Sequence, residues 1–283
     1  MNAAFKANPI MGIRELTRAI ADYRDQWDLP PNFDTDEIVN LLVSSTPLRE
    51  VRFSPLNHHE NNTEVRFAWR IENPLRIATS IRSGSYLSHA SAAFVHKLAT
   101  KAPPRIIVNK EQSAKPKHSG KLRQAAIDRA FAAVKQRSST FVFKFNDNEL
   151  VLLSGKHTSR LGVTAVDVGQ GKVDVTSPER TLIDIAVRPS YAGGIAEVLQ
   201  AYRSATQQRI SVSTLIEQLE GLQYTYPYHQ AIGYYMERAG FPKVECNKLK
   251  ALGTKFNFYL TYGMKEKRLN RDWKIYIPAG FET

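Results

Sequence analysis

The chain has only one cysteine, Cys246, and it has no uninterrupted run of the roughly 18 apolar residues that a membrane-spanning helix needs. A single cysteine excludes a disulfide framework within the chain and argues against a cysteine-based zinc site. The first residues, 1–11, lack the apolar core of a signal peptide. We therefore expect a cytoplasmic protein without a membrane partner.

Positive charge is in excess, because 39 Lys and Arg residues face 27 Asp and Glu residues and the formal net charge is +12 at pH 7. Such an excess is typical of proteins with an anionic partner, such as nucleic acid, an acidic protein or a membrane surface. The excess is uneven, with a net charge of −2 over residues 1–70, +10 over 71–137 and +4 over 138–283. Most of the positive charge thus lies in the middle of the chain.

The N-terminal part has the pattern of a small domain with two helices and a hairpin. Apolar residues at helical spacing predict a helix over 12–26. A second helix is expected from the N-cap Thr35 onward. Two partly alternating strands follow, at 48–53 and 63–69. We predict that residues 1–72 form a winged-helix-like, DNA-binding domain.

Six arginines of this domain are candidate DNA contacts: Arg14, Arg18, Arg49, Arg52, Arg66 and Arg70. Arginines on a hairpin can reach phosphates or a groove. The four on the predicted hairpin have a second interpretation, since solvated strand arginines pair with acidic neighbours such as Glu50 and Glu64. The sequence leaves both interpretations open.

Residues 73–283 combine helical and strand patterns, which predicts a larger mixed α+β domain. Its basic segment, 73–137, includes a polar stretch at 110–123 where we expect a loop. This loop is either an arm that follows the DNA phosphates or a solvated surface loop. Residues 206–283 would form a C-terminal subdomain. The candidate DNA contacts in the loop are Lys115, Lys117, Lys121 and Arg123.

Local signals predict the elements of this larger domain. Ser85 is expected to cap a helix that buries Tyr86 and Leu87. Ser177 followed by Pro178 is a strong helix start, because Ser favours the N-cap and Pro favours the first turn. The other expected elements are a short helix within 75–81, a strand at 105–108, a helix at 122–135, strands at 141–145, 149–153, 161–168 and 172–175, helices at 194–204, 212–220 and 226–239, and strands near 256–260 and 273–277.

No motif indicates catalysis, a metal or a cofactor. Residues 154–158 lack the earlier glycine of a phosphate-binding P-loop, and a strand is expected after them. His58, His59 and Glu60 lack the helical spacing of a zinc site. His89 lies among serines without a nucleophile elbow, so we expect a packed or hydrogen-bonded histidine. We therefore predict that the protein is not an enzyme and has no metal or cofactor.

Two clusters have structural interpretations beside functional ones. Arg180 and Asp184 are i,i+4 neighbours, and we favour an ion pair that fixes the helix. Five tyrosines form either an aromatic contact surface or part of the helix packing, and both interpretations stay open. They are Tyr224, Tyr226, Tyr228, Tyr234 and Tyr235.

Three further blocks are residues 85–92 (SYLSHASA), 105–109 (RIIVN) and 176–184 (TSPERTLID). In this order they resemble the AbiEi-type antitoxins of bacterial type IV toxin–antitoxin and phage-defence systems, over about residues 10–205. The resemblance implies a transcriptional regulator that binds DNA repeats, inverted or direct, in its own promoter. It also implies that the protein counteracts a nucleotidyltransferase-like toxin encoded next door. Gly-Ser followed by paired Asp, the toxin hallmark, is not found here, which favours antitoxin over toxin.

The leading hypothesis is therefore a DNA-binding antitoxin and autorepressor. One alternative is a protein-interaction module, whose basic middle segment binds an acidic toxin or another partner and has little direct role in DNA binding. A second alternative is a nucleic-acid-processing enzyme. That alternative requires a cluster of carboxylates or histidines, which the sequence does not assemble.

Overall fold

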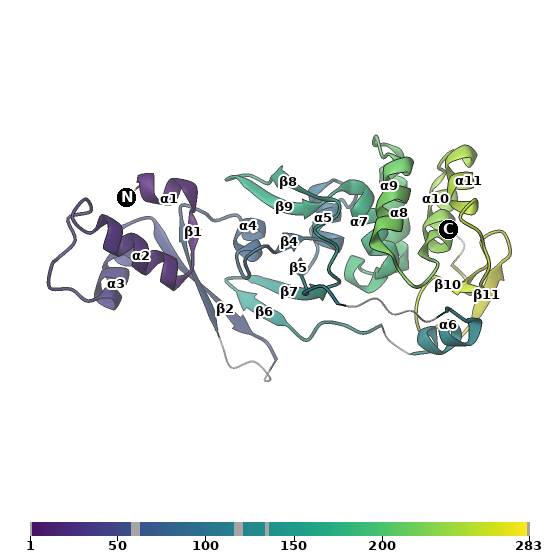
Figure 1. The fold of residues 1–283 in the computed structure, drawn as a ribbon, viewed down its shortest axis with the longest axis horizontal. Coiled ribbons are helices and arrows are strands. Elements are labelled where there is room, and N and C mark those ends of the chain that lie inside the picture. The colour runs from purple at the N-terminus through teal and green to yellow at the C-terminus, as the bar shows by residue number, and fades with distance from the viewer. Residues whose placement is uncertain (1, 58–62, 116–120, 134–135, 282–283) are drawn as a thin grey trace.

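The computed structural model describes residues 2–57, 63–115, 121–133 and 136–281. The protein is elongated, with the N-terminal helices at one end, a strand-rich middle, and the C-terminal helices at the other end (Figure 1). Helices and strands alternate in a mixed α+β architecture, which confirms the predicted fold class.

The N-terminal elements form a compact unit that we call the head. They are α1 (Asn2–Ala7), β1 (Ile10–Met11), α2 (Ile13–Tyr23), α3 (Thr35–Ser45), β2 (Leu48–Pro55) and β3 (Glu64–Trp69). Strand β3 lies between β1 and β2 and pairs antiparallel with both. Leu16, Ile38 and Phe67 are buried between the helices and this sheet, and the Phe5 and Trp69 rings stack 4.5 Å apart. The head therefore has a hydrophobic core of its own.

The start of α3 differs from the expectation, since its N-cap is Asp34 and not Thr35. The Asp34 Oδ1 atom accepts a hydrogen bond from the Glu37 amide at 2.8 Å, and Glu37 Oε2 accepts one from the Asp34 amide at 2.8 Å. This reciprocal capping box satisfies two amides at once, which a cap one residue later would not do. Helix α1 and strand β1 were not predicted, because six and two residues are too few to show a period.

The middle of the protein contains α4 (Pro74–Thr79), β4 (Tyr86–Leu87), α5 (His89–Val95), β5 (Ile106–Glu111), β6 (Val142–Phe145), β7 (Asn148–Gly155), β8 (Val163–Asp167) and β9 (Lys172–Thr176). Among the described residues, β1 to β9 form one sheet in the order β1-β3-β2-β6-β7-β5-β4-β9-β8. Strand β2 joins its two parts, because Leu48 to Phe53 pair with β3 while Ser54 and Pro55 pair with β6. The head is thus attached to the middle through a continuous sheet.

Both faces of the central strands β5 and β7 are covered. These strands are parallel, and their stretches 106–108 and 150–153 are apolar and buried, as is typical of strands that are covered on two sides. Ile106 and Val108 face one hydrophobic core, whereas Ile107 faces a smaller cluster with Val151 and Tyr191. The alternation of the strand then places Asn109 on the second face.

The helix expected after Ser85 begins later than predicted. Tyr86 and Leu87 form β4, which pairs antiparallel with β5 and parallel with β9, and the helix begins at His89 after the N-cap Ser88. Both apolar side chains are fully buried, as a helix there would also have required. The sheet pairing decides between the two structures, and it involves residues far away in the sequence.

The C-terminal part contains α7 (Pro178–Val187), the short 3-10 helix η1 (Pro189–Ala192), α8 (Ile195–Thr206), α9 (Val212–Leu222), α10 (Tyr228–Ala239), α11 (Lys243–Lys250), and the small sheet of β10 (Phe258–Tyr259), β12 (Ile275–Pro278) and β11 (Lys267–Asn270). The predicted start of α7 is confirmed, since Ser177 Oγ accepts a hydrogen bond from the Arg180 amide at 3.2 Å and Pro178 is the first helical residue. Helix α11 and strand β11 were not predicted.

Helix α6 (Gln124–Phe131) belongs to the C-terminal end although it precedes β6 in the chain. Its Phe131 ring stacks on Tyr262 at 4.3 Å and meets Phe258 edge to face at 5.0 Å. Residues 206–283, expected as a possible subdomain, share one hydrophobic core with α6, α7 and α8. Within the described part of the chain, no helix has both the length and the apolar composition to cross a membrane.

Candidate nucleic-acid interface

Helix α2 presents two arginines to solvent. Arg14 and Arg18 are exposed and stand one helical turn apart, whereas Leu16, Ala19 and Ile20 are buried on the other side of the helix. The described residues provide no ion-pair partner for either guanidinium. Two unpaired cations on one helix face are suited to contacts with a phosphate backbone.

The hairpin of β2 and β3 carries three more exposed arginines. Arg49 binds Glu72 at 2.9 Å, and Arg52 binds Glu50, with the arginine side chains 69% and 70% exposed. Arg70 directly follows β3 in an exposed position, with its guanidinium 5.9 Å from the centroid of the Trp69 ring. Exposed ion pairs are worth at most about 1 kcal/mol, so Arg49 and Arg52 can exchange a carboxylate for a phosphate at little cost.

Arg66 differs from the other hairpin arginines because its guanidinium is already occupied. It donates hydrogen bonds to the carbonyl oxygens of Ser80 at 2.8 Å and of Ile81 and Val65 at 2.7 Å each. It also lies 3.4 Å from a Glu64 carboxylate oxygen, and its side chain is 17% exposed. These bonds fasten β3 to the segment after α4, so we assign Arg66 a structural role and leave it out of the interface.

A groove of about 1040 Å³ runs between the head and the middle. Two cations of its lining are neutralised locally, since Arg66 and Arg82 both face Glu64, with Arg82 at 2.7 Å. The groove nevertheless places cations from the middle of the protein beside those of α2. The basic residues that line it are Arg14, Arg66, Arg76, Arg82 and Lys172, and the acidic ones are Glu15, Glu64 and Asp174.

Arg76 and Lys172 were not among the predicted contacts. They are 96 positions apart and line the same groove because α4 packs against β9. A Cβ atom added to Gly171 would lie 2.5 Å from Arg76 Nη1, so the guanidinium covers this turn. Burial lowers the pKa of Arg76, and the nearby Asp167 carboxylate partly opposes this effect. No local signal in the sequence could have placed these two residues together.

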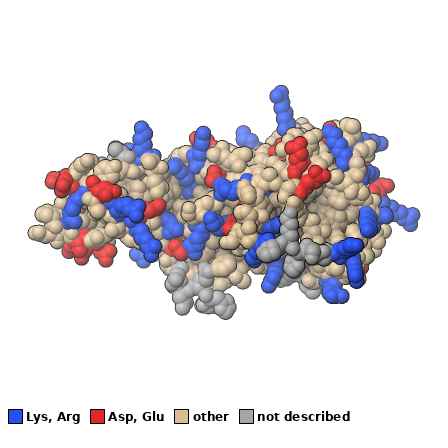
Figure 2. Space-filling view, viewed as in Figure 1, with Lys and Arg blue, Asp and Glu red and all other residues tan. Residues whose placement is uncertain are grey.

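The basic loop predicted to follow DNA phosphates lies elsewhere. Lys115 and Lys121 are exposed on the connection from β5 to α6, and Arg123 is the N-cap residue of α6. In Figure 1 this connection runs to the end of the molecule opposite the head. Lys117 lies outside the described residues. On the face shown in Figure 2, Lys and Arg side chains are spread along the whole length of the molecule rather than gathered in one patch.

The remaining motifs of the sequence have structural roles. Arg180 and Asp184 form the expected ion pair at 2.8 Å, and the two side chains are 6% and 5% exposed. His89 is hydrogen-bonded as expected, with its Nδ1 atom 2.9 Å from Ser88 Oγ. The segment after Gly155 leads into β8 and not into a helix, which confirms that it is no P-loop.

Two further candidates can be placed in part. His58, His59 and Glu60 lie outside the described residues, and among those described no group of three His, Cys, Asp or Glu residues is arranged to hold a metal ion. Two of the five tyrosines belong to the helix packing, and three lie on a cavity that a partner could contact. Tyr234 and Tyr235 are buried in the C-terminal core, whereas the other three tyrosines line a cavity: Tyr224, Tyr226 and Tyr228.

Comparisons with known proteins support the fold alone. No family model matches the chain, and no curated protein matches its sequence. Among solved structures, the fold is similar to that of the Rv2827c protein from Mycobacterium tuberculosis, with a TM-score of 0.58 and 16% sequence identity. The similarity covers 97% of this chain and 88% of the mycobacterial chain.

Proposed function

We propose that the protein is a cytoplasmic DNA-binding antitoxin that represses its own operon, as the resemblance to AbiEi-type antitoxins implies. One observation carries the DNA-binding part of this proposal. The head runs helix, strand, helix, helix, strand, strand, and its first strand closes on its last. A winged-helix domain has this order, and helix-turn-helix proteins of this kind place a recognition helix in the major groove.

Helix α3 would be that recognition helix. Its exposed residues Asn40 and Ser44 are one turn apart, and asparagine is suited to reading adenine in the major groove. The helix has no basic residue. The Asp34 and Glu37 carboxylates at its start accept hydrogen bonds from backbone amides in the capping box, so they are directed toward the helix end. Phosphate contacts would come from the arginines around it: Arg14, Arg18, Arg49, Arg52 and Arg70.

The test measures the affinity of the full chain for DNA from upstream of its own gene, as fluorescence anisotropy over a range of KCl concentrations. Each phosphate contact contributes about 0.9 to the slope of log Kd against log salt concentration. The double variant R14Q/R18Q should lower this slope by about 2. The matched control R129Q/R209Q removes two exposed arginines outside the head and should leave the slope unchanged. A slope that is the same in all three proteins would exclude α2 from the interface, and the absence of a salt-sensitive complex would exclude the repressor function.

A protein-interaction module is the second candidate, and the position of the basic loop favours it. Arg123 begins α6, which lies at the end of the molecule opposite the head, so a partner bound there would leave the head free for DNA. The variant K115E/K117E/K121E should then lose co-purification with the toxin encoded next door and keep its affinity for promoter DNA. Loss of DNA affinity with intact toxin binding would contradict this second candidate.

A further inference from the structure

A second cavity, of about 760 Å³, lies between the middle and the C-terminal part. Its walls come from the ends of β5 and β7, from α7, and from the segments 136–141 and 222–228. A cavity of about 300–1,000 Å³ is the size that holds a small-molecule ligand. The resemblance to the antitoxins assigns no ligand to this cavity, and neither does the DNA-binding proposal.

The cavity is strongly cationic. Its charged lining residues are Arg137, Lys156, Arg180 and Arg188 against the single carboxylate of Asp184. Two of these cations have partners, since Arg180 binds Asp184 at 2.8 Å and Lys156 Nζ donates to the Leu222 and Gln223 carbonyl oxygens at 2.9 and 3.1 Å. The cavity therefore keeps an excess of positive charge that the lining does not neutralise.

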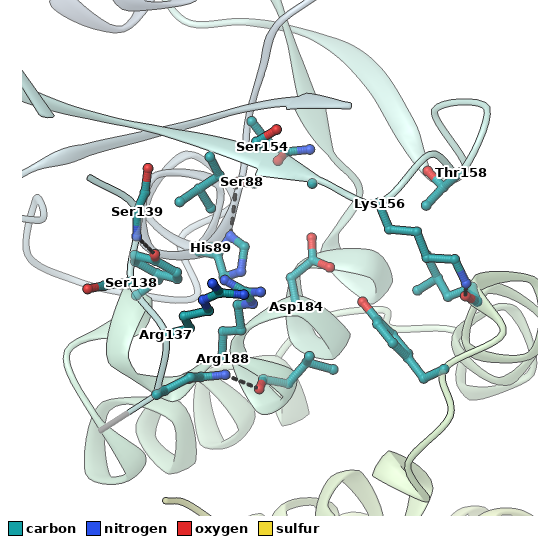
Figure 3. A pocket seen from close by; sticks show the side chains of 18 of the residues that line it. Ser88, His89, Arg137, Ser138, Ser139, Ser154, Lys156, Thr158, Asp184 and Arg188 are labelled. Carbon is teal, nitrogen blue, oxygen red and sulfur yellow. Dashed lines mark hydrogen bonds between the residues drawn. The ribbon is translucent and has the colours of Figure 1, made fainter. Parts of the chain in front are cut away.

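Arg137 and Arg188 hold this excess. No carboxylate of the described residues binds either guanidinium. The Arg188 guanidinium lies 5.9 Å from the centroid of the Tyr191 ring. The two side chains enter the cavity from separate segments and approach each other beside His89 (Figure 3). Like charges that share a partly enclosed space repel each other, and a bound anion relieves this repulsion. Since Arg forms forked hydrogen bonds to phosphate, a phosphate group fits the pair best.

The tyrosines of the lining favour a planar group next to the phosphate. Tyr224, Tyr226 and Tyr262 keep partly exposed side chains on the cavity, and their rings offer flat apolar surface with hydroxyl groups. Bases stack on aromatic rings of this kind regardless of their sequence. The Ser138 hydroxyl also lines this cavity and suits a hydroxyl of a sugar, whereas Ser139 Oγ already donates to the Leu152 carbonyl oxygen and accepts from the Phe141 amide.

The backbone at the cavity wall is strained. His89 has a φ of 49°, in the left-handed region that a non-glycine residue seldom adopts, and its side chain is buried. Strain of this kind persists where the surrounding structure fixes it, and it concentrates at ligand sites. The Ser88 hydroxyl and the Tyr191 ring, 5.4 Å away, hold the imidazole in place. These contacts at the cavity wall thus keep His89 in its left-handed conformation.

We propose that this cavity binds a nucleotide, with its phosphate on Arg137 and Arg188 and its base against the tyrosines. The ligand is either a free mononucleotide or the 5′-phosphorylated end of a nucleic-acid strand, because both present the same phosphate, sugar and base. The site is separate from the head, so the cavity and the DNA interface can be occupied together.

Isothermal titration calorimetry of the full chain tests this proposal. The probes are AMP, GMP, CMP and UMP, with adenosine and inorganic phosphate as partial ligands. We expect at least one nucleotide to bind at least tenfold more tightly than either partial ligand. R137Q and R188Q should each weaken this binding at least tenfold, R188K should recover part of it, and R129Q on α6 should have no effect. Circular dichroism checks that each variant is folded.

The two sources of the ligand are distinguished with a tetranucleotide, with and without a 5′-phosphate. Tighter binding of the phosphorylated tetranucleotide than of any mononucleotide would identify a strand end, and the reverse order would identify a free nucleotide. The proposal is wrong if no nucleotide binds at millimolar concentration, if inorganic phosphate binds as tightly as the nucleotides, or if R137Q and R188Q bind nucleotides like the native protein.

Discussion

Replacement of Asp184 by asparagine tests how much the buried ion pair contributes to stability. Every residue from Arg180 to Val187 is buried, so α7 has no solvated face on which a charge could be hydrated. In D184N the Arg180 guanidinium keeps its charge and loses its counter-ion. Removal of one partner from a buried pair costs about 3–5 kcal/mol.

The structure places D184N near the lower end of that range. Arg180 Nη1 also donates a hydrogen bond to the Leu161 carbonyl oxygen at 2.6 Å, and this bond survives the substitution. The asparagine amide oxygen can still accept a hydrogen bond from Arg180 Nε. We therefore expect a loss of about 3 kcal/mol in the free energy of unfolding.

Urea unfolding followed by circular dichroism measures this loss. The double variant R180M/D184L is the matched control, because it removes both charges and keeps similar volume, and such replacements of buried ion pairs are often neutral or stabilising. We expect it to recover most of the stability that D184N loses. A loss below about 1 kcal/mol in D184N, or a double variant as unstable as the single one, would refute the reasoning.

Three further predictions concern single positions. G233A should destabilise the protein by about 3 kcal/mol or less in urea unfolding, because the added Cβ would lie 2.1 Å from the Trp273 ring, which must then move; an unchanged midpoint would contradict this. S177A should cost about 1 kcal/mol through the lost N-cap hydrogen bond to the Arg180 amide, and S177D should recover part of it. Burial lowers the pKa of His89 to about 4, so the folded state binds a proton less readily than the unfolded state, and stability should fall as the pH drops from about 6.5 to 4. His89 should account for up to about 3 kcal/mol of this loss of stability in acid, and H89Q should lack that part. Thermal unfolding at a series of pH values measures the difference between the two proteins.

The sequence alone determined the features that depend on neighbouring residues. The apolar period of α2, the start of α7 at Ser177-Pro178 and the two strands β2 and β3 each follow from local rules, and the structure has all three. The ion pair of Arg180 and Asp184 was predictable for the same reason, since i,i+4 neighbours meet in any helix.

Only the tertiary structure decided the features that depend on distant partners. Tyr86 and Leu87 would be buried in a helix or in a strand, and the pairing with β5 and β9 selects the strand. The role of Arg66 follows from the carbonyl groups that surround it, and no neighbour of Arg66 along the chain indicates those groups. Along the sequence, most of the net charge of +12 lies in one basic segment. In the structure, α6 is part of that segment and lies at the end of the molecule opposite the head. Charge is additive along a sequence, whereas a binding surface depends on which charges share a face and which are already paired.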